Sequence, residues 1–217
     1  MNIGNKGSDV SYLDSYPQVV EKIDWALLLT SGERAFVGSN AAVPSGLLDD
    51  LIARHGQLYD IELVHILTLS DCPWAAVENK ALFKVNSLFI GAGVREAINQ
   101  GYADYTPCFL SEIPSLFSEG VLPLDVAFIM VSPPDELGYC SFGVSVDVVS
   151  AAVKSAKKVV AQINPHMPRT CGHSFVHMDE IDCAVVMDVP LPTIEVPVLD
   201  KPDQIVGLLL RCIYTRG

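Results

Sequence analysis

Residues 124–131 (LDVAFIMV) are apolar at every position except Asp125. A strand with one wet face would alternate polar and apolar residues, so this run predicts a strand that is covered on both faces. Similar runs occur at 61–69 (IELVHILTL), 157–163 and 182–187. Strands buried in this way are typical of sheets whose strands run parallel.

Helical segments and shorter strands fill the intervals between these runs. Helices are predicted from Ser45 as N-cap to about 55–56, at 94–100, from Ser111 with Pro114 in its first turn, and at 145–156 with Ser145 as N-cap and Asp147 in the first turn. Shorter strands are predicted at 25–30, 34–37 and 87–90. The alternation predicts an α/β fold, with a mostly parallel sheet flanked by helices.

The composition favours one large domain and excludes several classes of partner. Of 217 residues, 50% are hydrophobic and 18% are charged, and 26 acidic against 14 basic side chains give a net charge of −12. Such a chain repels phosphate backbones, so nucleic-acid and anionic-membrane partners are not expected. The polar segment 1–16 resembles neither a signal nor a transit peptide, and six dispersed cysteines without a CxxC pair fit reduced thiols, so a cytoplasmic location is expected.

A change of composition marks the end of the predicted domain. Residues 189–202 contain four prolines and are expected to form an extended linker. The predicted domain therefore covers 1–188, and 189–217 are the linker with the start of a further domain.

Two short motifs suggest chemistry only weakly. Gly91 and Gly93 lie between a strand and a helix, but the third glycine of a dinucleotide-binding turn is replaced by Glu96, so no NAD site is predicted. The segment around Ser145 nearly matches the GxSxG of a nucleophile elbow, but Asp147 replaces the last glycine, and helix capping explains it without catalysis.

A metal site is not predicted either. Cys171, His173, His177 and Asp179 lie close together in sequence, but the stretch around them has the character of a loop. Five isolated cations could meet an anionic group or form ordinary ion pairs, namely Arg34, Lys80, Lys84, Arg95 and Arg169.

Two rigid loops follow buried strands. Residues 132–143 contain two prolines, two glycines and two acidic residues, and 164–170 contain two further prolines. Ligands of open α/β sheets sit at the carboxyl ends of strands, so these loops predict a site or a domain interface there.

The same loops carry a resemblance to a known family. The runs VSPPDELGYCSFGVSVD (131–147) and QINPHMPRTCGHSF (162–175) resemble the amino-terminal half of the acetyl-CoA hydrolase/transferase family, which includes 4-hydroxybutyrate, butyrate and acetate CoA-transferases. The segments SGERAFVGSNAAVP (31–44) and FIGAGVR (89–95) fall in the expected order, and the similarity covers about residues 18–200.

The resemblance implies two similar α/β domains with the active site between them, and coenzyme A as a substrate without a covalently bound cofactor. A glutamate would exchange acyl-CoA and a short-chain carboxylate through a glutamyl-CoA thioester. In the family this glutamate lies in the second domain, so no catalytic residue is assigned here. In this half alone, the face that the second domain should cover would be exposed. We therefore expect the chain to self-associate or to bind a complementary domain.

Within this half, one wall of the cleft is expected. Its residues would shape the backbone and position the acyl or carboxylate group, and they are Ser39, Asn40, Pro44, Gly91, Gly93, Ser132, Pro133, Asp135, Gly138 and Gly143. Two alternatives remain open: an acetyl-CoA hydrolase of the same family, and a small-ligand binding or interaction module without catalysis.

Overall fold

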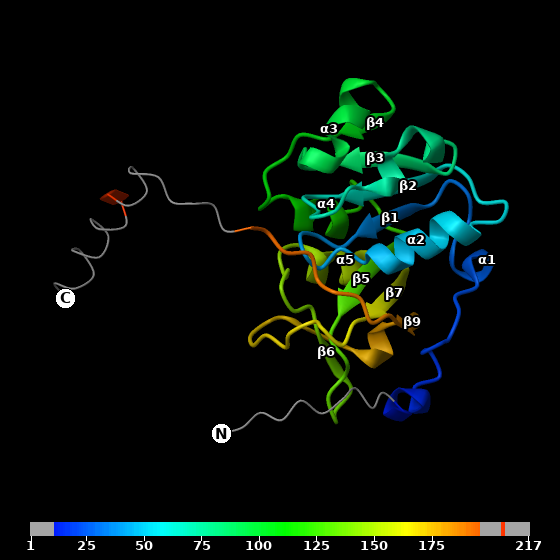
Figure 1. Cartoon of the computed structure of the whole chain (residues 1–217), viewed down its shortest axis with the longest axis vertical. Helices are drawn as coiled ribbons and strands as arrows, with labels where there is room; N and C mark the ends of the chain where they lie inside the picture. Colours follow the sequence, from blue (N-terminus) through cyan, green and yellow to red (C-terminus); the bar gives the residue numbers. More distant parts are fainter. Residues whose placement is uncertain (1–10, 196–204, 207–217) are drawn as a thin grey trace.

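A computed structural model describes residues 11–195 and 205–206 (Figure 1). Seven parallel strands form one sheet in the order β4-β3-β2-β1-β5-β7-β9, which confirms the predicted α/β class. The strands are β1 (Arg34–Val37), β2 (Ile61–His65), β3 (Phe83–Ser87), β4 (Ala103–Tyr105), β5 (Val126–Val131), β7 (Lys158–Ile163) and β9 (Cys183–Val186). A separate antiparallel ribbon joins β6 (Tyr139–Ser141) to β8 (Phe175–His177).

Helices cover both faces of the sheet. They are α1 (Trp25–Leu28), α2 (Ser45–Arg54), α3 (Ala92–Asn99), α4 (Ile113–Ser118) and α5 (Val149–Ser155), with 3-10 turns η1 (Ser11–Ser15), η2 (Pro73–Ala75), η3 (Val77–Asn79) and η4 (Met178–Glu180). One core cluster contains the apolar faces of α2 and α3, and the other contains those of α4 and α5. In the described part of the chain, no helix has the length and hydropathy to cross a membrane.

Two apolar layers hold the sheet between them. Along β1, Ala35 and Val37 pack in the first cluster, whereas Phe36 packs in the second. Every residue of β5 is buried, as the run 124–131 predicted. Because β1 and β5 are central, their side chains are sealed from water on both faces.

The prediction of a strand at 25–30 is wrong. Residues Trp25–Leu28 form helix α1, because the Asp24 carboxylate accepts a hydrogen bond of 3.2 Å from the Ala26 backbone N–H. Of the apolar side chains that suggested a strand, Trp25 and Leu29 are buried, and Trp25 packs edge-on against Phe128 at 5.8 Å between ring centroids, whereas Leu27 is exposed. A local cap therefore overrides the strand preference of this run.

The strand predicted at 87–90 is misplaced by four residues. Strand β3 covers Phe83–Ser87, and its exposed Lys84 binds Asp60 at 2.7 Å, so a charge interrupts the apolar pattern. The strand ends where the Ser87 hydroxyl donates to the Phe89 carbonyl at 2.6 Å. Similarly, β2 ends at His65 rather than at residue 69.

The helix predicted from Ser45 is confirmed, but Pro44 holds its cap position without a side-chain bond. The helix near Ser111 begins at Ile113, with Pro114 in its first turn as predicted, and α3 begins two residues early, at Ala92.

Ser145 does not cap α5, which begins four residues later at Val149. Its hydroxyl is engaged by Ser39 and Asp147, so it cannot serve the helix N-terminus.

The described part of the proline-rich segment, residues 189–195, contains no helix or strand. Leu191 packs against a small cluster of Ala42, Met130 and Met167. The remainder of the predicted linker and the tail 207–217 lie outside the described residues.

Candidate functional site

The order of strands changes direction between β1 and β5. Strands β2, β3 and β4 continue on one side of β1, and β5, β7 and β9 continue on the other. In open parallel sheets this switch point leaves a crevice at the carboxyl ends of the strands, where ligands bind. Ser39 and Asn40 come directly after β1 and therefore lie at the crevice.

A buried polar network occupies this position. Ser39 is 1% exposed, and its Oγ lies 2.7 Å from Ser145 Oγ. Both hydroxyls contact the carboxylate of Asp147, Ser145 at 2.9 Å, and the Val148 backbone N–H donates to the same carboxylate at 2.5 Å. The network joins the segment after β1 to the segment after β6 and fixes the Asp147 side chain.

Asn40 is held in a left-handed conformation, with φ of 49°. Asparagine tolerates this region better than most residues. Its backbone N–H donates to the Leu67 carbonyl at 2.6 Å, and the Leu69 N–H donates to the Asn40 carbonyl at 3.1 Å. The side-chain Nδ2 lies 3.4 Å from Ser145 Oγ, so Asn40 links the network to the segment after β2.

A cavity of about 300 Å³ opens beside Asn40. Apart from Asn40 and Asp147, its lining is apolar or a thiol: Ile66, Leu67, Leu88, Phe89, Cys108, Leu110 and Ile113. Its size is at the lower end of the range for small-molecule sites, about 300–1,000 Å³. An apolar chamber with two fixed polar groups on one side can hold a short carbon chain and orient a polar end.

Of the residues predicted for the cleft, Asn40 lines this cavity directly, and Ser39 lies behind it in the network. Pro44 lies at the start of α2, Gly91 and Gly93 lie at the start of α3, and none of the three lines the cavity. A Cβ on Gly91 would lie 3.0 Å from Leu67 Cδ1, and one on Gly93 would lie 2.6 Å from Cys72 Sγ. Both glycines therefore permit the start of α3 to approach the segment after β2.

The loop after β5 is braced by its own residues. The Ser132 N–H donates to the Ser141 carbonyl and the Ser141 N–H donates to Ser132 Oγ, both at 2.9 Å. Ser132 Oγ in turn donates to the Pro133 carbonyl at 3.0 Å. These bonds give the loop one backbone shape, but neither residue lines the cavity.

Asp135 organises the tip of this loop. Its carboxylate accepts hydrogen bonds from the backbone N–H groups of Tyr139, at 2.8 Å, and Leu137, at 3.0 Å, and pairs with Arg169. The Tyr139 N–H and these other contacts lower the pKa of Asp135 below its usual value. Asp135 is thus committed to loop structure.

The two loop glycines have positive φ, 82° at Gly138 and 66° at Gly143. A Cβ on Gly138 would lie 2.8 Å from His177 Nε2, and one on Gly143 would lie 2.1 Å from Met167 Sδ. Both positions therefore require glycine for conformation and for space.

The residues of the cysteine and histidine cluster at 171–179 lie at the surface or contact a neighbouring loop. Cys171 and His173 are exposed, and His177 Nε2 lies 2.9 Å from the Leu137 carbonyl. Within residues 11–195 and 205–206, no group of three His, Cys, Asp or Glu residues is arranged to hold a metal ion.

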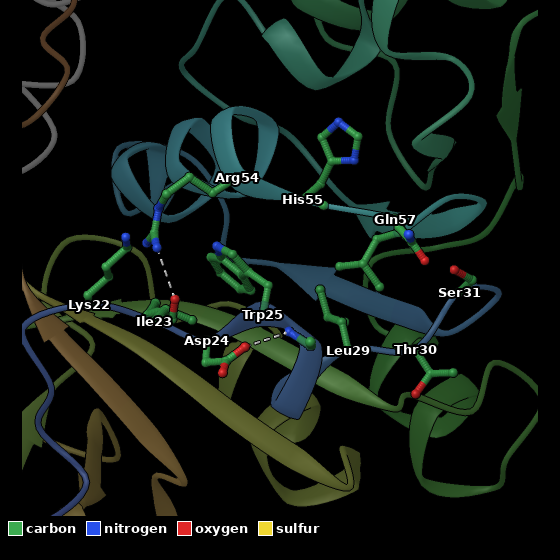
Figure 2. A pocket seen from close by; sticks show the side chains of 13 residues that line it. Lys22, Ile23, Asp24, Trp25, Leu29, Thr30, Ser31, Arg54, His55 and Gln57 are labelled. Atoms are coloured by element: carbon green, nitrogen blue, oxygen red, sulfur yellow. Dashed lines mark hydrogen bonds between the residues drawn. The ribbon is translucent and has the colours of Figure 1, made fainter.

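A larger hollow, of about 650 Å³, lies at the opposite edge of the sheet (Figure 2). Ser31 and Gln57 on its rim precede β1 and β2, so it faces the amino ends of the strands. Its Arg54 guanidinium bonds to Asp50 and to the Ile23 carbonyl, at 3.1 Å for the latter. Because it lies away from the switch point and its arginine is engaged, we place the candidate site at the smaller cavity.

Sequence reasoning missed the role of Asp147 and the apolar lining. The sequence predicts Asp147 in the first turn of a helix, whereas its tertiary partner Ser39 lies 108 positions away. The imperfect GxSxG pattern, placed after a strand, was the one available signal.

The chain matches the family model described as "Acetyl-CoA hydrolase/transferase N-terminal domain" over residues 6–197. It is 43% identical over 164 residues to the 4-hydroxybutyrate coenzyme A transferase of Clostridium kluyveri, covering 76% of this chain and 38% of that protein. It is also 43% identical over 155 residues to the succinyl-CoA:acetate/propanoyl-CoA:succinate CoA transferase of Fasciola hepatica, covering 70% and 32%.

Among solved structures, the 4-hydroxybutyrate CoA-transferase of Porphyromonas gingivalis is similar, with a TM-score of 0.69 and 30% identity. That match covers 84% of this chain and 43% of the other. The chain thus spans less than half the length of these relatives.

Proposed function

This chain belongs to the acetyl-CoA hydrolase/transferase family, and we propose that it forms one wall of the active-site cleft of a cytoplasmic CoA-transferase. The enzyme would move CoA between an acyl-CoA and a short-chain carboxylate such as 4-hydroxybutyrate, butyrate or acetate. The observation that supports this function is the cavity at the switch point, which pairs an apolar lining with the fixed polar groups of Asn40 and Asp147.

The proposed chemistry is a double exchange on a glutamate. The glutamate carboxylate attacks the acyl-CoA carbonyl and expels CoA thiolate, which leaves an acyl-glutamyl anhydride. The thiolate then attacks the glutamyl carbonyl, releases the first carboxylate and forms glutamyl-CoA thioester. The acceptor carboxylate repeats these steps in reverse, which regenerates the glutamate and yields the new acyl-CoA.

In this proposal, the chain binds and orients the acyl group while the second domain supplies the glutamate. No glutamate of the described residues lines the cavity. The rigid loop 132–143 and the Ser39–Ser145–Asp147 network would hold the wall in place, and the Asn40 amide could donate to a substrate oxygen. We further propose that 1–188 form this domain and that 189–217 connect it to the second.

The test is a CoA exchange assay with acetyl-CoA and butyrate, followed by chromatography of butyryl-CoA. We expect no exchange by the chain alone, and exchange when a polypeptide with the family's second domain is added. Mass spectrometry should then find CoA attached to the added polypeptide and not to this chain. Exchange by the chain alone would refute the proposal, as would inactivity of the mixture. Release of CoA without butyryl-CoA would indicate a hydrolase.

A further inference from the structure

In the part of the chain that the structure describes, the cavity at the switch point offers no basic side chain to pair with a carboxylate. Its described lining contains no lysine, arginine or histidine, and its one charged side chain is the carboxylate of Asp147. Ile66, Leu88 and Ile113 are each at most 5% exposed, so these three side chains form a buried, apolar part of the lining.

None of the five candidate cations lines the cavity, and three of them are engaged elsewhere. Arg34 binds Glu62 at 2.8 Å, and Lys84 binds Asp60 at 2.7 Å. Arg169 pairs with Asp135 and donates to the Tyr139 carbonyl at 2.8 Å. These contacts keep the three guanidinium and ammonium groups at their own ion pairs, and none of them lines the cavity.

Asp147 cannot easily turn away from the cavity. Its carboxylate contacts the hydroxyls of Ser39 and Ser145 and accepts from the Val148 N–H at 2.5 Å. These contacts hold the carboxylate of Asp147 in place on the polar wall of the cavity.

Building on the proposed function, we propose that this cavity selects the uncharged tail of a monocarboxylic acyl group and disfavours dicarboxylates such as succinate. A dicarboxylate has a charge at each end. Whichever end enters the cavity, one carboxylate of the dicarboxylate must lie inside it. There the carboxylate would lie either against the apolar lining without a partner or beside the carboxylate of Asp147, and both placements are unfavourable. A hydroxyl on the tail is compatible, because it can donate to Asp147 or accept from Asn40.

The inference differs from what the names of the relatives suggest. The Fasciola hepatica protein is named for reactions of succinyl-CoA and succinate. Selection against succinate would therefore be a property of this chain's cavity and not of the family.

The experiment is an NMR titration of the labelled 217-residue chain with butyrate and with succinate at pH 7, following the methyl groups of Ile66, Leu88 and Ile113. We expect butyrate to shift these signals with a Kd at least tenfold lower than that of succinate. Asp147→Asn should lower the ratio of the succinate Kd to the butyrate Kd at least threefold. Asp49→Asn removes a charge from the exposed side of α2, outside the cavity, and should change neither.

A second variant covers the case in which Asp147→Asn fails to fold. Leu110 is 59% exposed at the cavity, so Leu110→Lys should keep the fold and tighten succinate binding. Equal binding of the two ligands, or no shift of the three methyl signals, would overturn the inference. The titration requires no catalysis, so its outcome is independent of the exchange assay. If CoA exchange fails but the selectivity is present, only the proposed function is refuted. If CoA exchange occurs but the selectivity is absent, only the inference is refuted.

Discussion

At the residue scale, His65 should make the stability of the protein depend on pH. It ends β2, is 1% exposed, and neither ring nitrogen has a hydrogen-bond partner among the described residues. Burial lowers the pKa of His65 from 6.5 to about 4. Between these values the unfolded chain binds a proton that the folded chain does not, so the free energy of unfolding falls as the pH drops.

The measurement is urea unfolding at several pH values for the wild type and His65→Leu. We expect the variant to lose less stability between pH 7 and pH 4, by up to about 3 kcal/mol. His173→Leu, at an exposed histidine, serves as the control and should follow the wild type. Parallel curves for the wild type and His65→Leu would contradict the prediction.

At the element scale, the sequence predicted best where burial alone decides the structure. The apolar runs of β5, β7 and β9 and the amphipathic helix α2 identified the parallel sheet and its helical cover. Prediction failed where a single polar contact decides, as at α1, where Asp24 caps the chain. It failed also for β3, because Lys84 interrupts the apolar pattern on a strand next to the sheet edge.

The site shows the same division. The glycines and prolines of 132–143 and 164–170 predict loops of fixed backbone shape from the sequence alone. In the structure, the hydrogen bonds of Ser132 and Asp135 fix the first of these loops. The contact between Ser39 and Asp147 joins the segment after β1 to a segment beyond the neighbouring strand β5, 108 positions away, and no local pattern encodes it.

Close packing between α3 and the segment after β2 gives a prediction at this scale. A Cβ on Gly93 would lie 2.6 Å from Cys72 Sγ and 2.7 Å from the Ser70 carbonyl oxygen. Gly93→Ala should therefore lower the free energy of unfolding by about 1–3 kcal/mol, although alanine favours a helix. Asn99→Ala, at the exposed end of α3, should be neutral or slightly stabilising in the same denaturation assay. If Gly93→Ala and Asn99→Ala stabilised the protein equally, the segment after β2 would have moved without cost to accommodate the new Cβ, and the prediction would be wrong.

At the scale of the whole molecule, large apolar side chains surround the carboxyl edge of the sheet. Phe109 is 75% exposed, Leu110 59% and Phe89 57%, and the last two line the cavity. Exposed apolar groups gathered in this way mark surfaces that bind another protein surface. The proposed function assigns this face to the second domain, and without that domain two copies of the chain should cover it for each other.

We therefore expect light scattering to detect dimers or larger species of the isolated chain, in a proportion that rises with concentration. Phe89→Ser combined with Phe109→Ser should reduce that proportion severalfold, because it removes two exposed phenyl rings from this face. Leu27→Ser combined with Val121→Ser is the matched control: both residues are exposed, at 76% and 64%, but they precede β1 and β5 at the amino edge. A monomer at every concentration, or an equal effect of both pairs, would mean that this face is not the one that another domain covers.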